Sequence, residues 1–224
     1  MMLVAAFLGV SAAESILQES GAACVAEVPR LILEEINTLR SRDLTGNVYQ
    51  LLELYAEETS YLFDDGTEIG CFADDETNCS ENALEEYTFI TEALTTFDWS
   101  PGLAMAAEDL RETWINTGFQ SLQQPDGSDT WSRAKKYGIV GGSLSEFAFW
   151  LDAGENNTMK IKATDCVLTM LIGDGDSEKV ARNAIFDTSA TGKIYTQIGA
   201  AVGSRLGDRY VMCDIIFAEN YEES

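Results

Sequence analysis

The sequence predicts an α+β fold in which helices pack on a mainly antiparallel sheet. Apolar residues recur at helical spacing through the first half of the 224-residue chain. Two strand-like runs, Lys193–Val202 and Tyr210–Ala218, lie near its end, and a further helical pattern, Ala163–Leu171, precedes them. A chain of this length buries roughly 70% of the surface that its unfolded form exposes, so we expect a well-formed core.

The first expected helix begins at Val28 and presents one apolar face. That face consists of Val28, Leu31, Ile32, Ile36 and Leu39. A second helix is expected over Val48–Leu62, and helical spacing returns at Ala83–Leu94. Between them, residues 63–82 are acidic and contain glycine, which indicates a surface insertion.

The clearest helix start in the chain lies at Ser100 and Pro101. Serine is a favoured N-cap, and proline suits the first helical position. Apolar residues then follow at helical spacing: Leu103, Ala106, Ala107, Leu110 and Trp114. A polar loop is expected over Gln120–Asp129, and the aromatic-rich run Glu146–Leu151 has the character of a strand.

The composition excludes several classes of function. With 14 basic and 38 acidic residues, the chain has a formal net charge of −24. A polyanion is repelled by phosphate backbones and anionic membranes, so we expect no nucleic-acid partner. No apolar run reaches the roughly 20 residues of a transmembrane helix, so no membrane span is expected. The chain has no histidine, which removes Ser-His-Asp and Cys-His catalysis.

The N-terminal residues have features of a secretory signal peptide. Leu3–Val10 is apolar, and small residues suit a cleavage site after Ala12. We therefore expect residues 1–12 to be a signal peptide, 13–27 a lead-in and 28–224 a single domain of a secreted, extracellular protein. The alternative for the apolar run is the first turn of a buried helix.

Secretion gives the five cysteines a role, because disulfides form in oxidising compartments. Cys71 and Cys79 flank a short polar segment that a disulfide would staple. Cys166 and Cys213 lie on elements that could pack together and pair, which leaves Cys24 free or intermolecular. Two sequons are candidates for N-glycosylation: Asn78 and Asn156.

The acidic turn Asp174–Glu178 begins like the calcium loop of an EF-hand. Carboxylates stand at its first, third and fifth positions. The loop also needs glycine at its sixth position and glutamate at its twelfth, where this chain has Lys179 and Ile185. We therefore expect a solvated surface turn and no metal.

Four groups of residues follow one another in a familiar order. The first is Asn37 and Arg40 of the opening helix, and the second is the run Phe97–Leu103 before the alanine-bearing helix. The third group is Ser121–Gly127, followed by Arg133 and Tyr137-Gly138. The fourth is Gly173–Asn183, followed by Ile198-Gly199 and Phe217-Ala218. In this order and spacing, they resemble the CAP superfamily, the SCP/TAPS domain of cysteine-rich secretory, antigen 5 and pathogenesis-related 1 proteins, and its microbial branch most closely.

The resemblance implies a three-layer α-β-α sandwich with a cleft that two histidines and glutamates line. Leu122 and Ala181 stand at the positions of those histidines, whereas Glu146 matches one glutamate and Arg182 is retained. One carboxylate beside leucine and alanine cannot bind zinc, so we expect a degenerate cleft with no metal, no cofactor and no catalysis. A buried carboxylate needs a partner, and we expect Glu146 to accept hydrogen bonds from Arg182 or from nearby backbone N–H groups.

The resulting expectation is a secreted, non-catalytic binding or assembly module. Unknown extracellular proteins, copies of the chain itself, and a lipid or sterol are its possible partners, the last by analogy with the family. One alternative is a residual hydrolase that uses carboxylates alone, with Glu146 paired to Asp126 or Asp165. Another is an acidic surface protein that binds calcium.

Overall fold

The computed structural model describes residues 27–44, 46–57, 60–62, 68–70, 79–118, 120–152, 163–172, 179–188, 192–204 and 210–224. Its centre is a four-stranded sheet in the order β3-β6-β7-β5. The strands are β3 (Asp98–Trp99), β5 (Leu144–Asp152), β6 (Gln197–Ser204) and β7 (Tyr210–Ala218). Only β3 and β6 run parallel within this sheet, and the other two pairs are antiparallel. The α+β prediction with a mainly antiparallel sheet is therefore confirmed.

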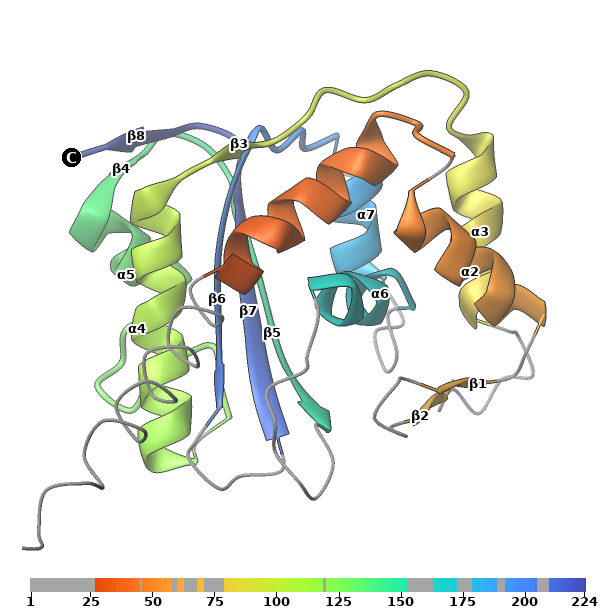
Figure 1. Cartoon of the computed structure of the whole chain (residues 1–224). Coiled ribbons are helices and arrows are strands. Elements are labelled where there is room, and N and C mark those ends of the chain that lie inside the picture. Colours follow the sequence, from red (N-terminus) through yellow and green to blue (C-terminus); the bar gives the residue numbers. More distant parts are fainter. Residues whose placement is uncertain are drawn as a thin grey trace, which may run out of the picture.

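Helices cover both faces of the sheet (Figure 1). On one face lie α4 (Pro101–Thr117) and α5 (Thr130–Tyr137). On the other lie the helix over residues 27–40, α6 (Ala163–Ile172) and α7 (Val180–Phe186). Two more helices pack beyond these, α2 (Asn47–Glu57) and α3 (Cys79–Phe89). The molecule thus has three layers, α-β-α.

Two short strand pairs complete the described part of the chain. β1 (Ser60–Leu62) pairs with β2 (Glu68–Gly70), and β4 (Gly138–Val140) pairs with β8 (Tyr221–Glu223). Both pairs are antiparallel. β8 brings the end of the chain beside α4 and α5.

The central strands divide the core because successive side chains of a strand point to opposite faces. Four β7 residues face the larger helical layer: Val211, Cys213, Ile215 and Phe217. The intervening residues face α4 and α5: Met212, Asp214, Ile216 and Ala218. β6 lets α4 approach very closely, since a Cβ added to Gly199 would collide with the backbone of Leu103 and Ala104.

Two side chains accept hydrogen bonds from the backbone N–H groups at the start of α4. Ser100 accepts from the backbone N–H of Leu103 at 3.1 Å, as predicted for an N-cap. Glu223 of β8 also reaches this end, where it accepts from Gly102 N at 2.9 Å and from Ser100 Oγ at 2.6 Å. A carboxylate at a helix N-terminus interacts favourably with the helix dipole. The C-terminal strand therefore holds the helix that supports one wall of the cleft described below.

The opening helix is anchored by the two residues that carried the first resemblance. Asn37 and Phe97 exchange hydrogen bonds, with Nδ2 donating at 3.0 Å and the Phe97 N–H donating back at 2.8 Å. Arg40 is fully buried and donates to the carbonyls of Thr95 and Ile185 and to Asp187. The helix over residues 27–40 is thereby joined both to the approach to β3 and to the end of α7.

A disulfide joins Cys166 of α6 to Cys213 of β7, with a Cα–Cα distance of 6.2 Å. Both cysteines are buried, so the bond ties the larger helical layer to the sheet from within the core. This pairing confirms the prediction. The proposed Cys71–Cys79 bond, Cys24, both sequons, the leader and the acidic turn over residues 173–178 lie outside the described residues.

Several local predictions were wrong at their edges. The helix expected over Val48–Leu62 ends at Glu57, and residues 60–62 form β1. α3 occupies Cys79–Phe89, earlier than the expected Ala83–Leu94. The short helices α5 and α7 were not predicted, because seven or eight residues give too little periodicity to distinguish a helix from a loop. Among the described helices, none combines the length and the apolar character needed to cross a membrane.

Candidate functional site

A cleft of about 390 Å³ lies beside β5 and brings together three residues that the sequence had singled out, Leu122, Glu146 and Ala181. They come from three separate elements: the α4–α5 loop, β5 and α7. The remaining lining residues are mostly apolar or aromatic: Trp114, Gln120, Ser121, Phe147, Ala148, Phe149, Thr169 and Met170. The cleft is therefore open, and its wall is largely hydrophobic.

The loop that carries Leu122 is fastened on both sides. Trp114 of α4 donates from Nε1 to the carbonyl of Ser121 at 2.9 Å. Arg133 of α5 donates to the carbonyl of Leu122 at 2.8 Å. The Leu122 side chain is 40% exposed and forms part of the rim, whereas Ala181 is buried in the opposite wall. With backbone carbonyls held in this way, the loop presents a defined apolar edge to the cleft.

Glu146 is paired with Arg133, an ion pair that sequence reasoning missed. Arg133 donates to both carboxylate oxygens of Glu146, one of them at 2.6 Å, and Thr130 donates to Oε2 at 2.6 Å. Only 2% of the Arg133 side chain and 1% of the Glu146 side chain are exposed. Burial raises the pKa of Glu146, although the charge and hydrogen bonds of Arg133 oppose that rise.

A second carboxyl group, Asp214 of β7, lies beside this pair. It is fully buried on the same face of the sheet, directly opposite Ala148 of β5. Burial, and then the charge of Glu146, raise the pKa of Asp214 well above its ordinary value. The raised pKa favours the protonated form of Asp214, which can donate to Glu146. The signal for this residue was a single acid in the otherwise apolar run Tyr210–Ala218.

Arg182 does not lie in the cleft, and the expected bond from Arg182 to Glu146 was wrong. Its side chain is fully buried on the far side of α7, where Nε is 2.8 Å from Glu86 of α3. It also donates to the carbonyl of Leu171 at 3.1 Å. α7 is one helix, but Ala181 faces the cleft and Arg182 faces α3 and α6. Adjacent positions on a helix point about 100° apart, which is why two sequence neighbours serve different surroundings.

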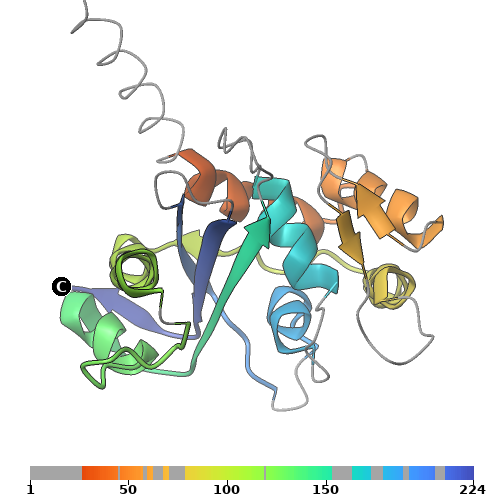
Figure 2. The same cartoon turned by 90° about the horizontal axis from the view of Figure 1, so that it is seen from below.

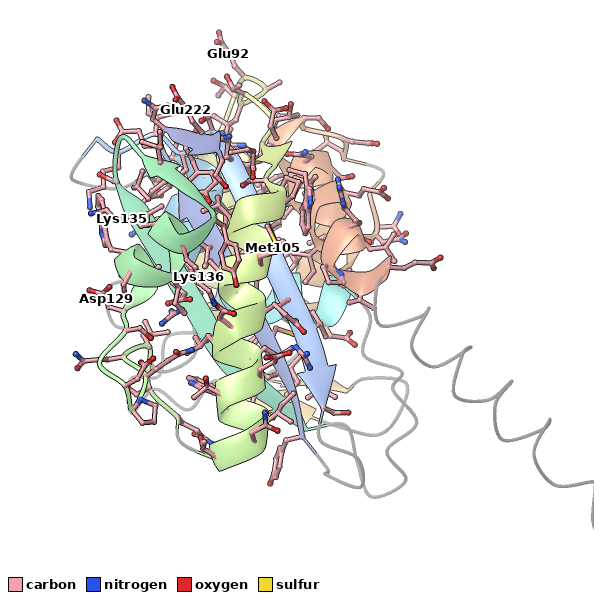
Figure 3. The ribbon with its side chains drawn as sticks, turned by 90° about the vertical axis from the view of Figure 1, so that its left-hand side faces the viewer. Glu92, Met105, Asp129, Lys135, Lys136 and Glu222 are labelled. Atoms are coloured by element: carbon pink, nitrogen blue, oxygen red, sulfur yellow. A yellow bond between two sulfur atoms is a disulfide. The ribbon has the colours of Figure 1, made fainter. Side chains whose placement is uncertain are left out.

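Neither of the acids suggested as a catalytic partner of Glu146 lines the cleft. Asp126 is exposed in the α4–α5 loop and accepts hydrogen bonds from Ser128. It borders a different hollow, of about 550 Å³, which residues of α4, that loop and α5 line. There Lys136 reaches from α5 to α4, with Nζ 2.9 Å from Asp109 (Figure 3). Asp165 lies on α6 outside the lining of either hollow.

The cleft side chains do not form a set of metal ligands. Leu122 and Ala181 supply no ligand atom, and both oxygens of Glu146 are committed to Arg133 and Thr130. In the part of the chain that the structure describes, no three His, Cys, Asp or Glu residues are grouped closely enough to hold an ion. A tetrahedral zinc site needs three or four such ligands.

Comparison with known proteins gave one structural similarity. No protein family and no curated protein matches the sequence. Among solved structures, an outer surface protein from Borrelia burgdorferi superposes with a TM-score of 0.42 at 14% identity, over 62% of this chain and 87% of that one. A similarity of this size carries no argument about family or role.

Proposed function

We propose that this chain is a secreted, non-catalytic binding module of CAP type, and that its cleft receives an apolar group of a partner. The observation that carries the proposal is the lining of the 390 Å³ cleft. The wall includes the large apolar side chains of Trp114, Phe147, Phe149 and Met170, and small-molecule and anchor-residue sites are typically concave and largely apolar. The open volume lies within the usual range of ligand pockets, roughly 300–1,000 Å³.

The chemistry at the floor of the cleft favours binding over catalysis. A general base must come within hydrogen-bond distance of the substrate and have a free lone pair to take its proton. The Glu146 side chain is only 1% exposed, and its oxygens already accept from Arg133 and Thr130. Asp214 is more deeply buried still. The bonds from Thr130 and Arg133 to Glu146 hold α5 against the sheet, which supports a structural role for this carboxylate.

The apolar lining recognises hydrocarbon, whichever molecule carries it. A sterol or lipid tail, which the resemblance implies, and an apolar side chain of a protein share this chemistry. The formal charge of −24 favours partners with basic or neutral surfaces. A role in binding or assembly outside the cell is consistent with the leader-like N-terminus and with the buried disulfide.

The proposal is tested by filling the cleft. Ala181→Trp places an indole in the cleft. Val180→Trp places the same group on the exposed side of the same helix. We expect a neutral apolar fluorophore such as Nile red to bind the wild type and Val180→Trp equally, and Ala181→Trp at least tenfold more weakly.

A second variant guards against misfolding of Ala181→Trp. Leu122→Glu changes a side chain that is already 40% exposed, so the fold should tolerate it, yet it places a charge on the apolar rim. Binding that survives both substitutions would show that the cleft is not the binding site.

A further inference from the structure

β5 is an edge strand of the central sheet in the described part of the chain. The strand order ends on it, with β7 on its one paired side. Both views show β5 outermost in the sheet, with the loop after α4 and the helices α6 and α7 to either side of it (Figures 1 and 2). Four consecutive β5 residues, Glu146–Phe149, line the cleft. Neighbouring side chains of a strand point to opposite faces of the sheet. A cleft that four consecutive residues line therefore runs along the edge of the strand.

The backbone of this edge carries outward-facing hydrogen-bonding groups that have no partner among the described residues. In an antiparallel pair, alternate residues direct both their N–H and their C=O to the partner, and the residues between direct theirs away from it. The ladder to β7 runs unbroken from Leu144 to Asp152, so it uses one side of β5 only. No other described group donates to or accepts from the backbone of Glu146–Phe149. Such groups are normally satisfied by water or by a partner.

We propose that the cleft is a strand-addition site, in which an extended basic segment of a partner protein pairs with β5 along Glu146–Phe149. This inference rests on the proposed binding function and names the partner. Added strands gain affinity from backbone hydrogen bonds and specificity from pockets for alternate side chains. The two walls supply those pockets: Trp114 and Leu122 on the α4 side, and Met170 and Ala181 on the side of α6 and α7.

The outward-facing backbone groups of β5 distinguish a peptide from the other candidates. A lipid tail or sterol would cover the outward N–H and C=O groups of β5 without pairing them, which costs free energy. A second copy of this chain could pair edge to edge, but each copy carries a formal charge of −24. Like charges on that scale oppose self-association, and a segment rich in lysine or arginine is attracted instead.

The test begins with a displayed library of random twelve-residue peptides, selected on the full chain. We expect the recovered peptides to be basic, to alternate apolar residues, and to bind Ala181→Trp at least tenfold more weakly than Val180→Trp. One recovered peptide is then synthesised with a single N-methyl group at each position in turn. Methylation should weaken binding up to about tenfold at every second residue and little at the residues between, because only alternate N–H groups face β5.

Amide hydrogen exchange supplies an independent readout of the same contact. Peptide binding should slow exchange at alternate amides within Glu146–Phe149, since those N–H groups become paired. Side-chain docking alone would leave their exchange rates unchanged. Strand addition is overturned if N-methylation has the same effect at neighbouring positions, or if exchange in β5 is unaffected by a bound peptide.

The outcomes separate this inference from the proposed function. Nile red or lipid binding that depends on Ala181, combined with peptides that show no alternation, would retain an apolar binding cleft and reject strand addition. Peptides and Nile red that both bind every cleft variant equally would reject strand addition and the proposed function together. A dimer that forms through β5, detected by ultracentrifugation, would overturn the proposal of a foreign partner. The added strand would then come from a second copy of this chain.

Discussion

The Arg133 guanidinium and the Glu146 carboxylate are paired inside the protein and almost completely removed from solvent. Arg133 also donates to the carbonyl of Leu122, so this one side chain joins α5, β5 and the loop at the rim of the cleft. The pair therefore fixes the position of the loop at the rim of the apolar cleft.

Removing the charge of Glu146 should destabilise the fold strongly. In Glu146→Gln, the buried Arg133 loses its counter-ion, and breaking a buried ion pair on one side costs about 3–5 kcal/mol. Urea unfolding should show this loss in free energy of unfolding. The same substitution at Glu222, an exposed residue of β8, should change stability by less than about 0.5 kcal/mol. Equal stability of the two variants would contradict a structural role for the ion pair.

Asp214→Asn should raise the free energy of unfolding at neutral pH, whereas Glu146→Gln should lower it. The pKa of Asp214 is raised in the folded state above its ordinary value of 3.8, mainly by burial. Between the unfolded and folded pKa values, the folded state binds more protons, so the contribution of this group to stability falls as pH rises. Asp214→Asn keeps the shape and a donor for Glu146 but removes that loss.

The prediction for Asp214→Asn is therefore a difference that depends on pH. The gain in free energy of unfolding over the wild type should be small near pH 4 and should grow from there through pH 6 to pH 8. Urea unfolding of both proteins at each pH measures it, and subtraction cancels most of the titration of the other acidic residues. A gain that is constant or shrinks with pH would show that Asp214 is ionised in the folded protein.

The close approach of α4 to β6 predicts a steric effect at Gly199. A methyl group in Gly199→Ala would collide with the backbone of Leu103 and Ala104, which cannot move away as a flexible side chain can. Overpacking of this kind costs about 1–3 kcal/mol. Thermal unfolding should show a lower midpoint, and an unchanged midpoint would mean that α4 shifts freely relative to the sheet.

The buried disulfide should account for a large share of stability. Its cysteines are 47 residues apart, and closing a loop of that length in the unfolded chain corresponds to about 4 kcal/mol. A Cys166→Ala, Cys213→Ala double variant should lose stability on that order in urea. Adding dithiothreitol to this variant measures how much the other cysteines contribute to the free energy of unfolding. An unchanged free energy of unfolding in the double variant would contradict the loop-closure estimate.

The structure confirms those sequence predictions that rest on local signals. The start of α4 at Ser100–Pro101, the strand Tyr210–Ala218 and the α+β class each follow from capping chemistry or from side-chain periodicity within one segment. The Cys166–Cys213 pairing was predicted on other grounds, because the two cysteines lie on elements that could pack together. The capping and periodicity signals are each complete within one segment, whereas the disulfide depends on how two segments pack.

The tertiary structure alone decided which charges meet. The sequence indicated that Glu146 needs a partner and pointed to Arg182 or to backbone N–H groups, whereas the packing of α5 on β5 pairs it with Arg133. Asp214 joins them because two strands align at Ala148. Short helices such as α5 and α7 depend on tertiary packing for their stability, so their faces are fixed only in the folded protein. A partner tens of residues away is chosen by the geometry of the whole core, and no local pattern encodes that choice.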